Sequence, residues 1–183
     1  MKFPRIIRLL MLFAIVAASQ TVFAQESSET NEAREKTRAR LSALLQRVGP
    51  EIKVNFQPST KSQYVFTGMM KDGLTNADSL EIVISVTTKD TIGFRVFPHY
   101  KGAYINIDKA RNTTQLLRKL VQLNESTFLF WGADDTGDVF TGYTFTLESG
   151  FPDEAIKIVL SSIRNSDQFV GEMRAAIDGS NAP

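Results

Sequence analysis

The sequence predicts an α+β domain in which an antiparallel sheet of about five strands packs against three helices. Several segments alternate apolar and polar residues and are rich in β-branched and aromatic side chains, which is typical of strands. Segments with apolar residues at helical spacing lie before, between and after them. The loops between the first strands are too short for a crossover helix, which makes those strands antiparallel. The predicted order is helix, three strands, helix, two strands, helix.

The first 24 residues have the pattern of a cleavable export signal. Lys2, Arg5 and Arg8 precede a charge-free apolar core at 9–18. This core is shorter than the roughly 20 apolar residues that a membrane-spanning helix needs. Compact residues then lead to Ala24, after which we expect cleavage. The mature protein is therefore expected to be periplasmic or secreted, without stable membrane insertion.

The remainder of the chain reads as one domain. Residues 25–30 are polar and are expected to be disordered, residues 31–178 form the domain, and 179–183 are a loose tail. We find no internal repeat and no linker within 31–178. A length of this size can support one hydrophobic core.

Charge and cysteine content narrow the function classes. The chain has 21 basic and 20 acidic residues, and three basic ones lie in the leader, which leaves 18 against 20 and a formal net charge of −2. Nucleic-acid binders usually carry a clear basic excess, so no nucleic-acid partner is expected. The sequence contains no cysteine, so the fold does not depend on disulfides.

The first predicted helix begins at Asn31 and ends at Gly49-Pro50, a pair that caps and stops helices. Only its second half has an apolar stripe, so the half at 32–40 is expected to be solvent-exposed. The residues of the stripe are Leu41, Leu44, Leu45 and Val48.

Strand patterns follow the first helix. A short extended piece lies at 52–56, and segments 64–70, 80–87 and 92–97 form the predicted three-strand meander. Turn residues separate these segments. Segment 103–108 is left open between a short strand and an extended approach.

The second half repeats the alternation of helices and strands. It is predicted to contain a helix at 113–123, strands at 127–131 and 139–148, and a long final helix opened by Pro152. The acidic and glycine-containing segment 134–138 predicts the turn between the strands. A polar stretch at 164–168 interrupts the apolar stripe of the last helix and predicts a bend there.

The piece LLRKLVQLNESTFLFWGADDTGDVFTGYTFTLESGFPDEAIKIVLSSI resembles the YbjN-like family of bacterial domains, related in fold to type III secretion chaperones. The matching features are the leucine-rich helix ending at Leu123-Asn124, the strand with Phe128 and Phe130, the acidic turn, and the helix opened by Phe151-Pro152. In topology the resemblance covers roughly residues 35–177. It implies an α+β sandwich without known catalysis, often dimeric, that binds other polypeptides. The export signal departs from secretion chaperones, which act in the cytoplasm, so the chain resembles an exported variant.

No catalytic or metal-ligating pattern is present in the sequence. His99 is the only histidine and follows Pro98 at the end of a predicted strand, with no cysteine or second histidine to share a metal. Asp134, Asp135 and Asp138 have the wrong spacing for a calcium loop and suit a hairpin turn. We therefore expect no catalytic residue, no metal site and no cofactor.

Aromatic residues are the more informative group, at 10% of the chain. Alternation puts Phe128 and Phe130 on one face of their strand and Trp131 on the other. Phe140 falls opposite Tyr143 and Phe145 unless a bulge at Gly142 resets the alternation. If one face of the sheet is exposed, these aromatics form a partner-binding surface; helices on both faces would instead make them core. The residues predicted for that surface are Phe128, Phe130, Trp131, Tyr143 and Phe145.

These observations favour an exported, non-enzymatic binding or chaperone-like module that holds a protein or peptide or associates with itself as a homodimer. Two alternatives stay open. One is an exported hydrolase that uses His99 and a nearby carboxylate. The other is an envelope protein anchored by an uncleaved N-terminal helix.

Overall fold

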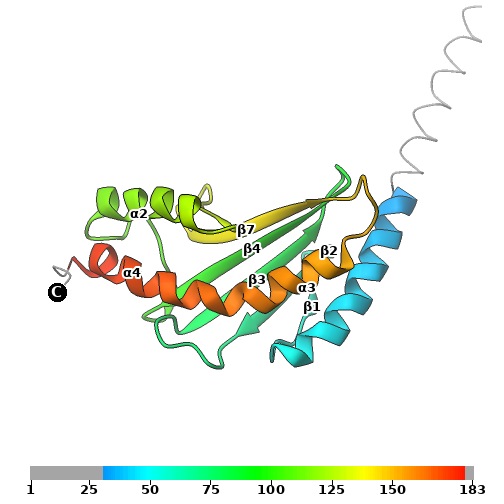
Figure 1. The fold of residues 1–183 in the computed structure, drawn as a ribbon, viewed down its shortest axis with the longest axis horizontal. Helices are drawn as coiled ribbons and strands as arrows, with labels where there is room; N and C mark the ends of the chain where they lie inside the picture. The colour runs from blue at the N-terminus through cyan, green and yellow to red at the C-terminus, as the bar shows by residue number, and fades with distance from the viewer. Residues whose placement is uncertain (1–30, 180–183) are drawn as a thin grey trace, which may run out of the picture.

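The computed structural model describes residues 31–179. The predicted signal peptide (1–24), the polar segment (25–30) and residues 180–183 of the predicted tail lie outside this part. The α+β class is confirmed, and the order of helices and strands roughly matches the predicted order (Figure 1). Within the described residues, no helix is both long enough and apolar enough to cross a membrane.

One antiparallel sheet of seven strands forms the centre of the fold, in the order β1-β2-β3-β4-β7-β6, with β5 paired to β4 outside this path. Two strands more than the expected five are present because the short β1 and β5 also pair with their neighbours. The strands are β1 (Gln57–Ser59), β2 (Ser62–Met70), β3 (Ser79–Val86), β4 (Thr91–Tyr100), β5 (Ala103–Tyr104), β6 (Phe130–Ala133) and β7 (Val139–Thr146).

The helices connect and cover this sheet. The N-terminal helix extends from residue 31 to 51 in the described part. Helix α2 (Thr113–Ser126) connects β5 to β6, which is an edge strand of the sheet. The chain then turns into β7, which pairs with β6 on one side and with β4 on the other. The predicted last helix is two helices, α3 (Asp153–Ser162) and α4 (Ser166–Asp178), joined by a 3-10 turn at Ile163–Asn165. The interruption lies at the start of the predicted polar stretch.

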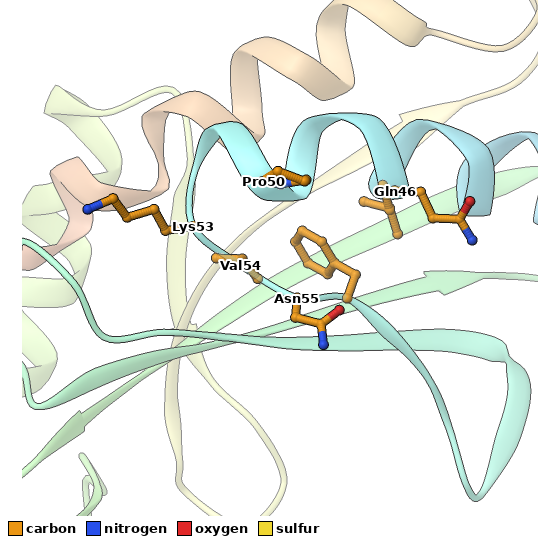
Figure 2. A pocket seen from close by; sticks show the side chains of 7 residues that line it. Gln46, Pro50, Lys53, Val54 and Asn55 are labelled. Atoms are coloured by element: carbon orange, nitrogen blue, oxygen red, sulfur yellow. The ribbon is translucent and has the colours of Figure 1, made fainter.

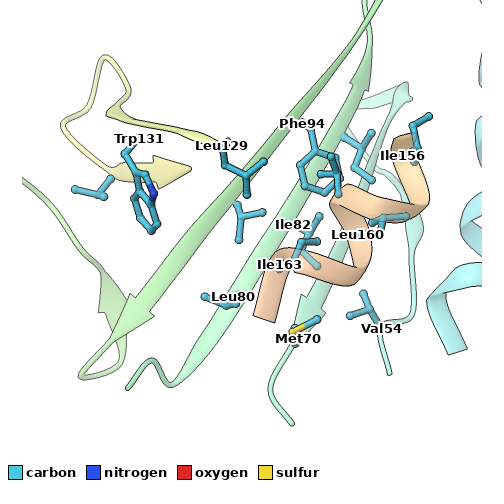
Figure 3. Close-up of a cluster of buried hydrophobic side chains, with 14 of the residues drawn as sticks. Val54, Met70, Leu80, Ile82, Phe94, Leu129, Trp131, Ile156, Leu160 and Ile163 are labelled. Carbon is cyan, nitrogen blue, oxygen red and sulfur yellow. The ribbon is translucent and has the colours of Figure 1, made fainter. Parts of the chain in front are cut away.

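All helices of the described chain lie on one face of the sheet. A single apolar cluster contains inward residues of the strands, such as Ile82 and Phe94, together with Leu160 of α3 (Figure 3). The predicted stripe of the N-terminal helix and the leucines of α2 belong to the same cluster. Because successive strand residues point to opposite faces, the outward residues of these strands lie on a face that no described helix covers.

The sequence predicts that the first half of the N-terminal helix is solvent-exposed. In the structure, however, Arg34 of this half contacts the sheet. Arg34 donates hydrogen bonds from Nε (3.0 Å) and Nη2 (2.8 Å) to the carbonyl oxygen of Val86, the last residue of β3. Its guanidinium also lies 3.6 Å from the centroid of the Tyr64 ring. The missing apolar stripe is thus replaced by polar and cation–π contacts with the sheet.

Asp167 joins the start of α4 to the loop between β2 and β3. Its carboxylate accepts hydrogen bonds from the backbone N–H groups of Thr75 (2.8 Å), Asn76 (2.9 Å) and Ala77 (2.7 Å). The residue is only 7% exposed. Burial opposes its ionisation, but these donors outweigh burial and hold the pKa of Asp167 below its ordinary value.

Replacement of this carboxylate should destabilise the fold. We expect Asp167→Asn to lower the free energy of unfolding by about 1–3 kcal/mol near neutral pH, because the amide cannot accept all three backbone donors. A depressed pKa stabilises the fold above the ordinary value of 3.8, and this contribution is lost as pH falls through the lower folded-state pKa. Urea unfolding at a series of pH values should therefore show the two proteins converging in acid. Asp72→Asn, an exposed position in the same loop, should behave like the wild type; a constant difference at all pH values would refute the assignment.

Candidate functional site

The helix-free side of the sheet, here called the open face, is built by the outward side chains of β2, β3, β4, β6 and β7 and by Tyr104 of β5. The strand register fixes which of these are neighbours. Arg95 lies between Val83 on one side and Gly142 on the other, and Gly142 is opposite Phe130. Residues far apart in the chain therefore meet on one surface.

Four aromatic rings form a row across the open face. The ring centroids are 5.7 Å apart from Phe130 to Phe140, 5.6 Å from Phe140 to Phe97, and 6.0 Å from Phe97 to Tyr104. These separations are those of packed aromatic pairs. The two ends are accessible, with Phe130 44% and Tyr104 39% exposed, whereas Phe140 in the middle is buried. We call these four residues the aromatic row.

Arg95 covers the middle of the aromatic row. Its guanidinium carbon lies 4.5 Å from the centroid of the Phe140 ring, within the range of a cation–π contact. The residue is exposed, and it forms no salt bridge with any acidic side chain of residues 31–179. The open face therefore presents one positive charge held against apolar rings.

A hollow of about 340 Å³ lies beside Arg95 and Phe130. Glycines create it: Gly93 in β4 lies between Ser85 and Thr144 and has no side chain to fill the space. Gly142 lies beneath Phe130, since a Cβ atom there would be 2.5 Å from the carbonyl oxygen of Phe94 and 3.1 Å from Cζ of Phe130. The open face is thus hollowed where small residues adjoin the aromatic row.

His99 lies at the end of the open face, next to Glu81 and Tyr104. The Tyr104 hydroxyl donates to Oε2 of Glu81 at 2.5 Å, and Nε2 of His99 is 3.4 Å from the same oxygen. The hydrogen bond to Glu81, burial and the charge of Glu81 raise the pKa of Tyr104 to about 12. Among residues 31–179, no hydroxyl is hydrogen-bonded to His99.

The residues predicted for a partner surface divide between the two sides of the sheet. Phe130 is on the open face. Phe128 (57% exposed) and Tyr143 lie on the helix side, with ring centroids 6.4 Å apart, and Phe145 packs 4.9 Å from Tyr143. Trp131 and Phe145 are buried in the core.

Phe128 and Phe130 do not share a face because β6 begins only at Phe130. The hydroxyl of Thr127 lies 2.9 Å from the carbonyl oxygen of Leu123 and 2.6 Å from that of Leu129, and this turn precedes the strand. Strand β7 has no bulge in its pairing with β4. Phe140 therefore lies on the open face and Tyr143 on the helix side, as the unbroken alternation predicts.

Two further hollows lie on the helix side. One of about 440 Å³ lies where the N-terminal helix ends, between Pro50 and the segment Val54–Phe56 (Figure 2). The other, of about 400 Å³, lies between the α2–β6 connection and the break between α3 and α4, beside Phe128 and Phe169. Neither hollow is lined by an acidic residue. Lys53 is the only charged residue that lines either of these two hollows, and its Nζ lies 3.7 Å from Oδ2 of Asp72.

The aspartates of segment 134–138 organise a turn. Asp134 accepts hydrogen bonds from the backbone N–H groups of Thr136 (3.0 Å) and Asp138 (2.9 Å). Burial opposes ionisation of Asp134, but hydrogen bonds from Thr136 and Asp138 hold its pKa below the ordinary value. Within residues 31–179, no group of three or more acidic or histidine side chains is arranged to hold a metal ion.

The edges of the sheet are closed by specific residues. At the β6 edge, the Asn124 side chain donates to the carbonyl oxygen of Trp131 (3.1 Å) and accepts from its N–H (2.5 Å), as a neighbouring strand would. At the other edge, β1 has three residues, a register shift and Pro58, which has no N–H to donate. The β6 and β1 edges are thus protected in part, whereas Tyr143–Thr146 of β7 extend beyond β6 and pair only with β4.

The chain was compared with known proteins. No family model matches it, and no curated protein matches it. Among solved structures, the crystal structure of YbjN from E. coli, a proposed transcription regulator, is similar with a TM-score of 0.46 and 13% identity, over 72% of this chain and 89% of that one. This is a distant likeness of fold, and we assign neither family nor function from it.

Sequence reasoning did not select Arg95, Phe97, Tyr104 and Phe140. The alternation in IGFRVF does place Gly93, Arg95 and Phe97 on one face. However, only the pairing of β4 with β7 brings Phe97 beside Phe140, and a sequence does not show which strands are neighbours.

A methyl group at position 142 should disturb the open face. We expect Gly142→Ala to lower the free energy of unfolding by about 1–3 kcal/mol, because the new Cβ would contact a backbone carbonyl that cannot move aside easily. The matched control is Gly132→Ala in β6, where the nearest atom would be 3.8 Å away, and it should change stability by less than about 0.5 kcal/mol. Thermal or urea unfolding measures both, and equal effects would contradict the packing of Phe130 on Gly142.

Proposed function

We propose that this protein is a non-enzymatic binding module that holds a segment of another polypeptide against its open face. The observation that carries the proposal is the aromatic row on a face that no described helix covers. Its exposed ends, Phe130 and Tyr104, are of the residue types enriched where proteins bind one another. Exposed apolar surface of this kind is typical of interaction sites.

The geometry of the row suits a polypeptide. Neighbouring rings are about 6 Å apart, and alternate side chains of an extended strand repeat at roughly 6–7 Å. An extended segment that crosses the sheet can therefore place alternate side chains along the aromatic row. Because Asn124 binds the backbone groups of Trp131 and Pro58 interrupts β1, recognition by side chains across the face is favoured over addition of a strand at β6 or β1.

Binding can be tested by placing a photoreactive amino acid at position 130 in the full-length protein in cells. We expect crosslinks to another polypeptide from position 130 and none from position 158 of α3, an exposed position (64%) on the helix side. The purified partner should then bind Phe130→Ser at least tenfold more weakly than the wild type, because exposed aromatic anchors dominate such interfaces, and should bind Ile158→Ser normally. Crosslinks to the same chain would indicate self-association instead, and equal crosslinking from both positions would refute an open-face site.

The proposal includes export, with removal of the leader after Ala24. The basic start, the short apolar core and the compact residues before position 25 support it. Intact-mass spectrometry of the chain recovered from cells should give the mass of a protein beginning at Gln25. Recovery of the full-length mass in the membrane fraction would favour the anchored alternative.

A further inference from the structure

We infer that the hollow beside Arg95 is a carboxylate-binding site, which recognises an acidic side chain of the polypeptide held on the open face. This inference rests on the proposed function. It names the chemistry that would select one segment over another, since apolar rings alone discriminate poorly between sequences.

The guanidinium of Arg95 has no hydrogen-bond or salt-bridge partner among the described residues. Two arginines of the described chain bind backbone carbonyls: Arg34 binds that of Val86, and Arg174 binds that of Asn76. Arg95 has no hydrogen bond or salt bridge to residues 31–179, and its guanidinium carbon lies 4.5 Å from the centroid of the Phe140 ring. A guanidinium that contacts a ring and whose N–H groups have no acceptor among these residues is suited to bind a carboxylate with two parallel hydrogen bonds.

Small and hydroxyl-bearing residues form part of the lining of the hollow. Ser85, Gly93 and Thr144 lie side by side across three strands and form its floor, and Phe130 forms a wall. A Cβ atom at position 93 would lie 2.9 Å from Oγ of Ser85, so the glycine keeps this space open. The two hydroxyls can donate to an oxygen that also faces Arg95.

The charges around the hollow favour a ligand with one negative charge. No acidic residue lines the hollow. Two carboxylates lie nearby but are already bonded. Oε2 of Glu81 accepts a hydrogen bond from the Tyr104 hydroxyl and lies 3.4 Å from Nε2 of His99. The charge of Arg95 helps to lower the pKa of Asp134, but Oδ1 of Asp134 accepts from the backbone N–H groups of Thr136 and Asp138. One positive charge without a second cation matches a singly charged carboxylate better than a phosphate dianion. A volume of about 340 Å³ accommodates a side chain and is small for a cofactor.

The test uses two capped peptides, acetyl-Gly-Phe-Glu-Phe-Gly-amide and its twin with Gln in place of Glu, titrated into the mature protein and followed by NMR. We expect the Glu peptide to shift the backbone signals of Ser85, Gly93 and Thr144, and to bind at least tenfold more tightly than the Gln peptide. Arg95→Gln should remove this preference. Arg118→Gln, which removes an exposed arginine of α2, should keep it.

The remaining outcomes overturn the inference in different ways. Equal binding of the two peptides, unchanged by Arg95→Gln, would exclude carboxylate recognition while leaving open-face binding intact. Equal affinity for N-acetylglutamate alone and for the Glu peptide would mean a site for free small carboxylates and not for a polypeptide. Absence of any shift at millimolar peptide would also overturn it, and the proposed function would still be decided by crosslinking from position 130, which uses no peptide.

Discussion

The one-sided burial of the sheet is the constraint on which the rest of this structure depends. Every helix of residues 31–179 contributes to one apolar cluster on the same face, so the inward positions of the strands must stay apolar. The outward positions are free of that requirement. This freedom allows an unpaired arginine, two strand glycines and an accessible phenylalanine to occupy neighbouring places on β4, β7 and the edge strand β6. The core therefore determines where a site can exist, although it contributes no side chain to it.

Much of the architecture could be predicted because it follows from periodicity. The stripe from Leu41 to Val48 is buried as expected, and the three strands of the meander lie where alternation placed them. Periodicity fails at the short elements: β1 contains a proline and only polar neighbours, and it is a strand only because β2 pairs with it. It fails again at Phe128, where a side-chain hydrogen bond of Thr127 turns the chain before β6 begins.

The candidate site was harder to predict because its members come from non-consecutive strands. Alternation gives the direction of Arg95 and Phe97, but their partners Phe140 and Phe130 depend on β7 lying between β4 and β6. The polar residues that attach helices to the sheet were equally hidden. Arg34 binds the end of β3 and Asp167 binds the β2–β3 loop through backbone groups, and such contacts leave no pattern in a sequence. Short-range rules thus describe the scaffold, whereas long-range pairing creates the surface.

The closure of the β6 edge by Asn124 has a chemical consequence. A single carboxamide supplies both the donor and the acceptor that satisfy Trp131. Asparagine side chains hydrolyse slowly in water, and conversion of Asn124 to aspartate would bring a negative oxygen against the carbonyl of Trp131. The N–H of Trp131 could still donate to the carboxylate, but its carbonyl oxygen would lose its donor and face a negative charge. The protection of this edge therefore depends on a single side-chain amide group.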